Sequence, residues 1–305
     1  MRFFIRSLLG VLLTVAAVSA QELRVVTTQP DLAFLAEAIG GDDVRVYSLT
    51  KGTEDLHLQR TRPSMLVRLS RADVLLELGL DAEHAWLPAL LQRARNRKIR
   101  PGGPGFLNCS ALVKVRRKPT ARTRASGPDL HPRGNPHFNL DPENVRLMAR
   151  LIRDHFSKLN PDRAARYRKA CARLEEEIDA HMKVWTKKLA PFKGAAFMEH
   201  HDAWTYFAHR FGLRIVARLE PAPGLAPTPS HLARVIKIGR REHVGIVAAR
   251  PANADVAEKV ARAIGAKTAI LPLSSTTKGR YKGYFHYMDQ VVDTFAAGLK
   301  KPENR

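Results

Sequence analysis

The chain has 305 residues, of which 45% are apolar, so it can form one large or two ordinary domains with buried cores. Its 51 basic residues outnumber 29 acidic ones, which gives a formal net charge of +22. This composition excludes intrinsically disordered and collagen-like chains. Only Cys109 and Cys171 are present, so a disulfide scaffold and a Cys-rich zinc module are excluded, while a single bridge between the two stays open.

Residues 1–20 have the composition of an export signal. Arg2 and Arg6 precede an apolar stretch, residues 8–18, that is too short to span a bilayer comfortably. Small residues lead up to Ala20, after which we expect cleavage. The mature protein is then expected to be soluble and periplasmic, with a retained N-terminal anchor as the alternative.

Basic residues cluster at residues 93–100 and 116–124. Nucleic acid or an anionic membrane surface could bind such clusters, but no aromatic side chains are interleaved for base stacking. Export also removes the chain from nucleic acid. We therefore expect a solvated basic surface and no nucleic-acid partner.

Short runs rich in Val and Leu alternate with segments of helical periodicity in both halves of the chain. This order predicts an α/β fold with two lobes, in which mainly parallel sheets are flanked by helices. The predicted strands cover residues 23–27, 44–49, 74–78, 195–198, 214–219, 244–248 and 268–271. The predicted helices in the lobes cover residues 31–39, 63–71, 84–95, 202–211, 230–242, 254–264 and 287–299.

Two glycine-free helical segments, residues 142–159 and 161–189, lie between these halves. Asn160 is expected to cap the second helix, with Pro161 at its first position. That helix would be about 43 Å long at about 1.5 Å per residue, the length of a strut between two lobes. We therefore predict an N-terminal lobe at 21–160, a linking helix at 161–189 and a C-terminal lobe at 190–305. A coiled-coil arm of a dimer is the alternative to the monomer that we expect.

Three of the twelve histidines, His57, His137 and His201, lie in loops or at element ends, each before a helix. In α/β lobes, ligands bind at this edge of the sheet. Neutral imidazole suits Zn²⁺, whereas Mn²⁺ prefers more carboxylate oxygen. His131 and His200 are open as auxiliary ligands or simple loop residues. The remaining histidines in helical, charge-rich surroundings are expected to be solvated: His84, His155, His181, His231 and His243.

At these positions the sequence resembles the zinc and manganese substrate-binding proteins of bacterial ABC importers, whose lobes are joined by a rigid helix. Residues 54–57 (Glu-Asp-Leu-His), followed by 62–64 and 72–75, are similar to the first-ligand region of the family. Residues 131–142 are similar to the second-ligand motif, and 201–213 to the third. Residues 219–230 are a further family feature, so the resemblance covers nearly the whole mature chain.

The resemblance implies that His57 and His137 of the N-terminal lobe and His201 of the C-terminal lobe bind the metal between the lobes. Many family members add a carboxylate near residues 270–275, but no acid occurs there in this chain. The fourth ligand is therefore open among water, Glu220 and His200. The His-rich loop of the family is replaced by the basic run at 116–124.

The function implied is capture of Zn²⁺, with Mn²⁺ as the less favoured cargo, and its delivery to an ABC permease in the inner membrane. Such a protein is not an enzyme and has no catalytic residues. The alternative is a secreted zinc-dependent hydrolase, because three histidines and a water also form catalytic zinc sites. No His-Glu-x-x-His helix is present, and Glu199 is the acid to test as a general base.

Overall fold

The structure is a computed structural model that describes residues 22–117 and 131–300. The expected export signal, residues 1–20, and residues 118–124 of the second basic cluster lie outside the described residues. Within the two described ranges, each helix is too short or too polar to cross a membrane.

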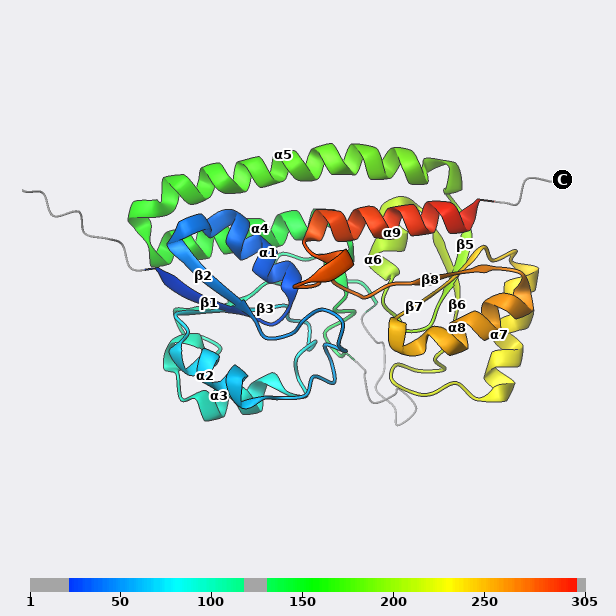
Figure 1. Ribbon diagram of the computed structural model, residues 1–305, viewed down its shortest axis with the longest axis horizontal. Helices are drawn as coiled ribbons and strands as arrows, with labels where there is room; N and C mark the ends of the chain where they lie inside the picture. The colour runs from blue at the N-terminus through cyan, green and yellow to red at the C-terminus, as the bar shows by residue number, and fades with distance from the viewer. Residues whose placement is uncertain (1–21, 118–130, 301–305) are drawn as a thin grey trace, which may run out of the picture.

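The first sheet has four parallel strands in the order β2-β1-β3-β4. Helices cover both of its faces (Figure 1). Its edge strand β4 was missed by the sequence analysis, because three residues are too few for a recognisable hydrophobic pattern. The strands are β1 (Leu23–Thr27), β2 (Val44–Ser48), β3 (Val74–Glu77) and β4 (Phe106–Asn108).

The second sheet repeats this arrangement, with four parallel strands in the order β6-β5-β7-β8. Its strands are β5 (Ala196–Glu199), β6 (Arg214–Arg218), β7 (Ile246–Ala249) and β8 (Lys267–Ile270). We refer to each sheet with its flanking helices as the N-terminal and the C-terminal lobe. The predicted two-lobe α/β fold is confirmed.

Most helices begin where the sequence places a proline or a capping side chain. Proline lies in the first turn of α1, α2, α3, α4 and α7. The side chain of Asp141 caps α4 by accepting a hydrogen bond from the N–H of Glu143. The helices are α1 (Pro30–Gly40), α2 (Pro63–Arg71), α3 (Leu87–Ala94), α4 (Pro142–Leu159), α5 (Ala164–Leu189), α6 (Thr205–Phe211), α7 (Pro229–Arg241), α8 (Ala254–Ile264) and α9 (Tyr284–Leu299).

The long helix α5 runs across both lobes (Figure 1). It begins after a 3-10 turn at Pro161–Arg163, and Asn160 and Pro161 occupy the expected N-cap and first positions of that turn, although the Asn160 side chain makes no capping hydrogen bond. Along its length α5 packs against α4, α1 and α9 and buries Leu174, Ile178 and Trp185. Because its apolar face is covered within the chain, the coiled-coil arm is not what the helix forms. The lobe boundaries at 160 and 189 stay a prediction.

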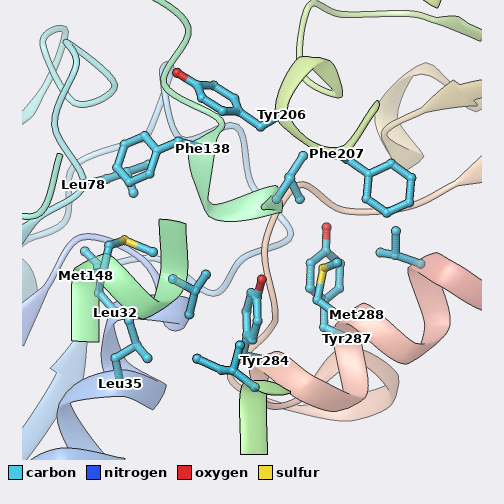
Figure 2. Close-up of a cluster of buried hydrophobic side chains, with 14 of the residues drawn as sticks. Leu32, Leu35, Leu78, Phe138, Met148, Tyr206, Phe207, Tyr284, Tyr287 and Met288 are labelled. Carbon is cyan, nitrogen blue, oxygen red and sulfur yellow. The ribbon is translucent and has the colours of Figure 1, made fainter. Parts of the chain in front are cut away.

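One continuous hydrophobic core underlies α1, α4, α5 and α9 and extends through both lobes. Leu32 and Met148 of the N-terminal lobe and Phe207 and Tyr287 of the C-terminal lobe belong to the same cluster (Figure 2). Burying each such side chain contributes about 1.5 to 3 kcal/mol. The lobes are therefore joined by shared packing on this side and are not connected by a linker alone.

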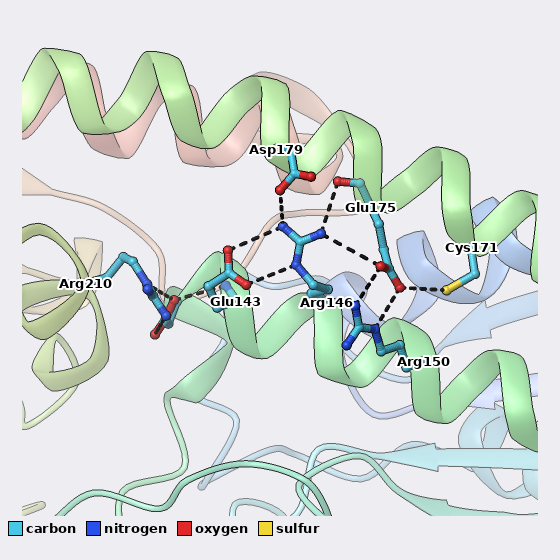
Figure 3. A network of polar contacts seen from close by, with 8 residues as sticks. Glu143, Arg146, Arg150, Cys171, Glu175, Asp179 and Arg210 are labelled. Atoms are coloured by element: carbon cyan, nitrogen blue, oxygen red, sulfur yellow. Dashed lines mark hydrogen bonds and ion pairs between the residues drawn. The ribbon is translucent and has the colours of Figure 1, made fainter.

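A network of charged side chains also joins α4 to α5 (Figure 3). Arg146 on α4 forms ion pairs with Glu143, Glu175 and Asp179. Nε and Nη2 of Arg150 each donate a hydrogen bond of 2.8 Å to one carboxylate oxygen of Glu175. Paired, forked contacts of this kind hold two helices in one register.

Some local expectations are wrong. The helix expected at 84–95 begins only at Leu87, because Pro88 suits the first turn of a helix and not its interior, and residues 80–86 form turns. His84 therefore lies in a turn, where it is exposed as expected. His181 is not simply solvated, since its ring stacks on Phe285 at 4.5 Å.

His155, His231 and both cysteines are buried or half-buried. His155 is half-buried, and burial lowers its pKa. His231 is also half-buried, with Nε2 3.0 Å from the carbonyl oxygen of Arg218. Cys109 and Cys171 are both buried and form no disulfide, which settles the question that the sequence leaves open.

Candidate metal centre

Three buried histidines meet between the two lobes. His57 lies in the loop between β2 and α2, His137 in the segment before α4, and His201 in the loop after β5. Each offers a ring nitrogen, and these three atoms lie within 4.8 Å of one another. The ring centroids are 5.1 Å apart for His57 and His137, 5.2 Å for His137 and His201, and 5.8 Å for His57 and His201. The fold thus gathers the three histidines that the sequence analysis selects.

A small cavity of about 30 Å³ adjoins His57 and His137 and is also lined by Arg250 of the C-terminal lobe. A cavity of this size can hold a water molecule or an ion of similar size. Arg250 forms an ion pair with Asp55 at 2.6 Å, and this pair connects the C-terminal lobe to the loop that carries His57. The site is therefore enclosed by both lobes.

The ring of His57 is oriented by the backbone. Its Nδ1 lies 3.1 Å from the carbonyl oxygen of Ala82, a contact that is a hydrogen bond only if Nδ1 carries the proton. Nε2 is then unprotonated, and it faces Nε2 of His137 at 3.3 Å. A carbonyl partner of this kind fixes the tautomer and orientation of a histidine that binds a metal.

The turn that presents Ala82 is held by a buried acid. Glu83 is 1% exposed, and its carboxylate accepts hydrogen bonds from the N–H groups of Leu78 at 2.8 Å and Gly79 at 3.2 Å. Burial, followed by the nearby carboxyl group of Glu77, raises the pKa of Glu83 to about 8. The sequence analysis missed Glu83, because an acid in a turn is ordinarily solvated and nothing local distinguishes this one.

His137 is placed by the side chain of Asn135. The backbone N–H of His137 donates to Oδ1 of Asn135 at 2.9 Å. Nδ2 of the same amide donates to the backbone oxygen of Asp202 at 2.7 Å and to its carboxylate at 3.1 Å. Because Asp202 adjoins His201, one amide ties together the loops of two candidate ligands from different lobes. The sequence analysis did not single out Asn135.

Burial, followed by the neighbouring rings of His57 and His201, lowers the pKa of His137 well below its ordinary value. Its ring is therefore neutral at physiological pH. A metal ion binds only the neutral ring, so the site is prepared for a cation without first losing a proton there.

His201 is oriented by Glu220, which lies on the loop after β6. Nδ1 of His201 is 2.8 Å from Oε2 of Glu220, and Nδ1 of the neighbouring His200 is 3.3 Å from Oε1. Burial of Glu220 opposes its ionisation, but the hydrogen bonds from His200 and His201 outweigh this and lower its pKa to about 2. Glu220 is thus an ionised carboxylate behind the histidines.

Neither open candidate for the fourth ligand joins the group of three ring nitrogens, within the part of the chain that the structure describes. Glu220 is engaged with the two histidines, and His200 directs Nδ1 to Glu220. His131 lies closer, with its ring centroid 4.4 Å from that of His57, although it too is outside the group of three.

Glu199, the candidate general base of the hydrolase alternative, has a structural position. It is completely buried, accepts hydrogen bonds from the N–H groups of Ala203 and Trp204 at 3.2 and 2.8 Å, and forms an ion pair with Arg218 at 2.6 Å. These contacts hold the loop that carries His201. The Glu199 carboxylate is thus engaged by protein groups.

Three imidazole rings held by carbonyl, carboxylate and amide partners match the donors that bind zinc and other late divalent metals. Such a site can bind a metal ion with three protein ligands and leave a fourth position open. Because the ligands come from two lobes, bound metal would add a connection between them.

The chain was compared with protein families, with relatives and with solved structures. A family model described as "Zinc-uptake complex component A periplasmic" matches residues 25–298, nearly the whole chain. The chain is 31% identical over 99 residues to a high-affinity zinc uptake system protein ZnuA from Brucella abortus, a match that covers 32% of this chain and 30% of that protein.

Longer matches are weaker in identity. A high-affinity zinc uptake system protein ZnuA from Yersinia pestis is 24% identical over 290 residues, covering 90% of this chain and 91% of its own length. Among solved structures, a ZnuA deletion mutant with zinc bound superposes with a TM-score of 0.78 at 22% identity, covering 93% of this chain and 100% of that one. This likeness supports the fold described above.

Proposed function

The chain belongs to the family of periplasmic zinc-uptake components, and from this premise we propose that it is the solute-binding component of an ABC importer, with Zn²⁺ as its cargo. His57, His137 and His201 are the proposed protein ligands. The observation that carries the proposal is that three buried ring nitrogens from two lobes lie within 4.8 Å of one another. The loaded protein would deliver the ion to a permease in the inner membrane.

The donor set favours zinc over manganese. The group of three that the described residues form contains imidazole alone, and the nearest acid, Glu220, is bonded to His201 and His200. Mn²⁺ prefers oxygen ligands, whereas a site of neutral imidazoles suits Zn²⁺. We propose water for the fourth position, because the adjoining cavity of about 30 Å³ has room for it.

The transport cycle would involve limited movement. The shared core beneath α5 and α9 restricts opening on that side of the molecule. The carboxylate of Asp31 on α1 also accepts hydrogen bonds from the backbone N–H of Ser275 and from Nδ2 of Asn139, both at 2.8 Å, so α1 is tied to the C-terminal lobe. Metal binding would therefore order the loops around the site and change the surface that the permease contacts without a large hinge motion.

The test begins with elemental analysis of protein purified without chelator, followed by titration of metal-stripped protein in zinc buffers. One equivalent of zinc per chain is expected. Thermal unfolding provides a second measurement, because ligand at about 1,000 times Kd adds about 4 kcal/mol to the free energy of unfolding. A stripped sample whose melting temperature does not respond to zinc would contradict the proposal.

A screen for hydrolysis by the zinc-loaded protein separates this proposal from the hydrolase. The family is one of uptake components, and Glu199 is engaged with backbone N–H groups and Arg218. We therefore expect zinc binding without turnover. Zinc-dependent turnover that disappears in Glu199→Gln would instead favour the enzyme.

A further inference from the structure

Two more histidines extend the cluster of three toward the surface. The ring centroid of His131 lies 4.4 Å from that of His57, and the centroid of His84 lies 6.0 Å from that of His131. His131 is buried, with 8% of its surface exposed, whereas His84 is exposed. The rings of His84, His131 and His57 therefore form a series that leads from solvent to the candidate metal centre.

The spacing in this series is similar to that within the centre. The three candidate ligands have ring centroids 5.1 to 5.8 Å apart, and His84 and His131 are separated by only slightly more. Imidazole rings at such distances can share one metal ion, with Zn–N bonds of about 2.0 to 2.1 Å. A small rotation of the exposed His84 side chain would bring the pair into the same range.

The ring of His84 is also oriented for a metal. Its Nδ1 lies 2.7 Å from the carbonyl oxygen of Asp81, a contact that is a hydrogen bond only if Nδ1 donates, and this leaves Nε2 as the nitrogen that can bind a metal. The carboxylate of Asp81 is on the same turn and is 3.4 Å from the exposed guanidinium of Arg133. This turn is the one that Glu83 holds through Leu78 and Gly79, so His84 has a fixed backbone.

We propose that His84 and His131 form a second, weaker site for divalent metal, which takes the ion from solvent and passes it to His57. The inference rests on the proposed function, because it assigns the route to the same centre. Two protein ligands bind zinc less tightly than three, and water completes the coordination. The ion moves inward by ligand exchange. Nitrogens of His57 and the inner histidines first replace the waters, and then replace His84 and His131. No bond of the protein is made or broken, so only metal–ligand bonds exchange.

The first test measures the rate of zinc association by stopped flow. Variants His84→Ala, His131→Ala and His131→Phe are compared with the wild type and with His286→Ala, whose exposed histidine on α9 is the matched control. His131→Phe keeps a ring against His57 but removes both nitrogens, so it separates ligation from packing. Association is expected to slow by about tenfold in the His84 and His131 variants, within the range that substitutions produce in association rates.

Zinc affinity should change much less than the rate in these variants, because the three inner ligands stay in place and dissociation slows together with association. Association rates equal to those of the wild type and of His286→Ala would overturn the proposal. Slow association in His131→Ala that returns to the wild-type rate in His131→Phe would also overturn the proposal, because it would assign the effect to packing.

The second test removes the main centre. In the double variant His137→Ala, His201→Ala, Co²⁺ absorption is expected to report one weak equivalent, and adding His84→Ala or His131→Phe should abolish it. No weak binding in the double variant, or weak binding that survives both additions, would contradict the second site. Because wild-type zinc binding is measured separately, a failure here is distinguishable from a failure of the proposed transport function.

Discussion

The carboxylate of Glu220 lies 2.8 Å from Nδ1 of His201 and so fixes which nitrogen of that ring faces the other two histidines. The acid and the histidine come from loops after neighbouring strands, β6 and β5, of the C-terminal sheet. Glu220 would therefore act on a bound metal through His201, and its removal should have a different effect from the removal of a ligand.

Substitution of each candidate ligand should cost much more zinc affinity than substitution of Glu220. His57→Ala, His137→Ala and His201→Ala each leave two protein ligands, where zinc ordinarily has three or four. Glu220→Gln keeps an oxygen that can accept from His201 and should cost about tenfold in affinity, at the lower end of the range for such partners. Titration in metal-buffered solution measures all four values. Equal losses in the four variants would contradict the assignment of three ligands.

The contribution of His137 to the stability of the metal-free protein should decrease as the pH falls below about 6.5. The pKa of His137 is lower in the folded protein than in the unfolded chain, because burial disfavours the charged ring. The unfolded chain therefore binds a proton that the folded protein does not, and this group lowers the free energy of unfolding by up to about 1.4 kcal/mol per pH unit. Urea unfolding between about pH 8 and pH 5 measures the slope.

The matched variant for this measurement is His137→Asn, which cannot titrate. The raised pKa values of Glu83 and Glu199, about 8 and about 7, act in the opposite direction, since their contribution to stability is lost as the pH rises. The informative quantity is thus the difference between the wild type and His137→Asn. A difference that does not change between about pH 7 and pH 5 would mean that His137 is not kept neutral by the fold.

Glu83→Ala should weaken zinc binding although Glu83 is not a candidate ligand. Without its carboxylate the N–H groups of Leu78 and Gly79 lose their acceptor, and the carbonyl of Ala82 no longer holds Nδ1 of His57 in place. An affinity loss of about tenfold or more is expected, as for other groups that orient metal ligands. Glu83→Gln should restore part of it, because the amide oxygen can still accept. A variant that is less stable but whose folded molecules bind zinc with unchanged affinity would show that Glu83 has a structural role only.

Arg146→Met should destabilise the protein by about 1 to 2 kcal/mol, because the variant leaves the partly exposed carboxylates of Glu143, Glu175 and Asp179 without this partner in the contact between α4 and α5. The matched control is Arg153→Met, which removes an ion pair with the exposed Asp154 and should cost less than about 1 kcal/mol. Urea unfolding of both variants tests the comparison, and equal midpoints would show that the network does not hold the two helices.

The sequence alone determined the elements that have a strong local pattern. The bounds predicted for β1, α2, α4 and α8 agree with the structure, because continuous apolar runs, proline at a first turn and helical spacing act over a few neighbouring residues. Resemblance in short motifs likewise selected His57, His137 and His201. Each of these inferences depends on residues that are close together along the chain.

Only the tertiary structure decided how the centre is assembled and supported. The carbonyl of Ala82 behind His57, the carboxylate of Glu220 behind His201, and the ring of His131 beside His57 all lie on segments that the order of parallel strands brings together. Loops at strand ends have no periodicity, so their sequences do not reveal which groups meet across them. Hydrogen bonds and ring contacts are sensitive to differences in distance of roughly a few tenths of an ångström, and only the packed sheets and helices set those distances.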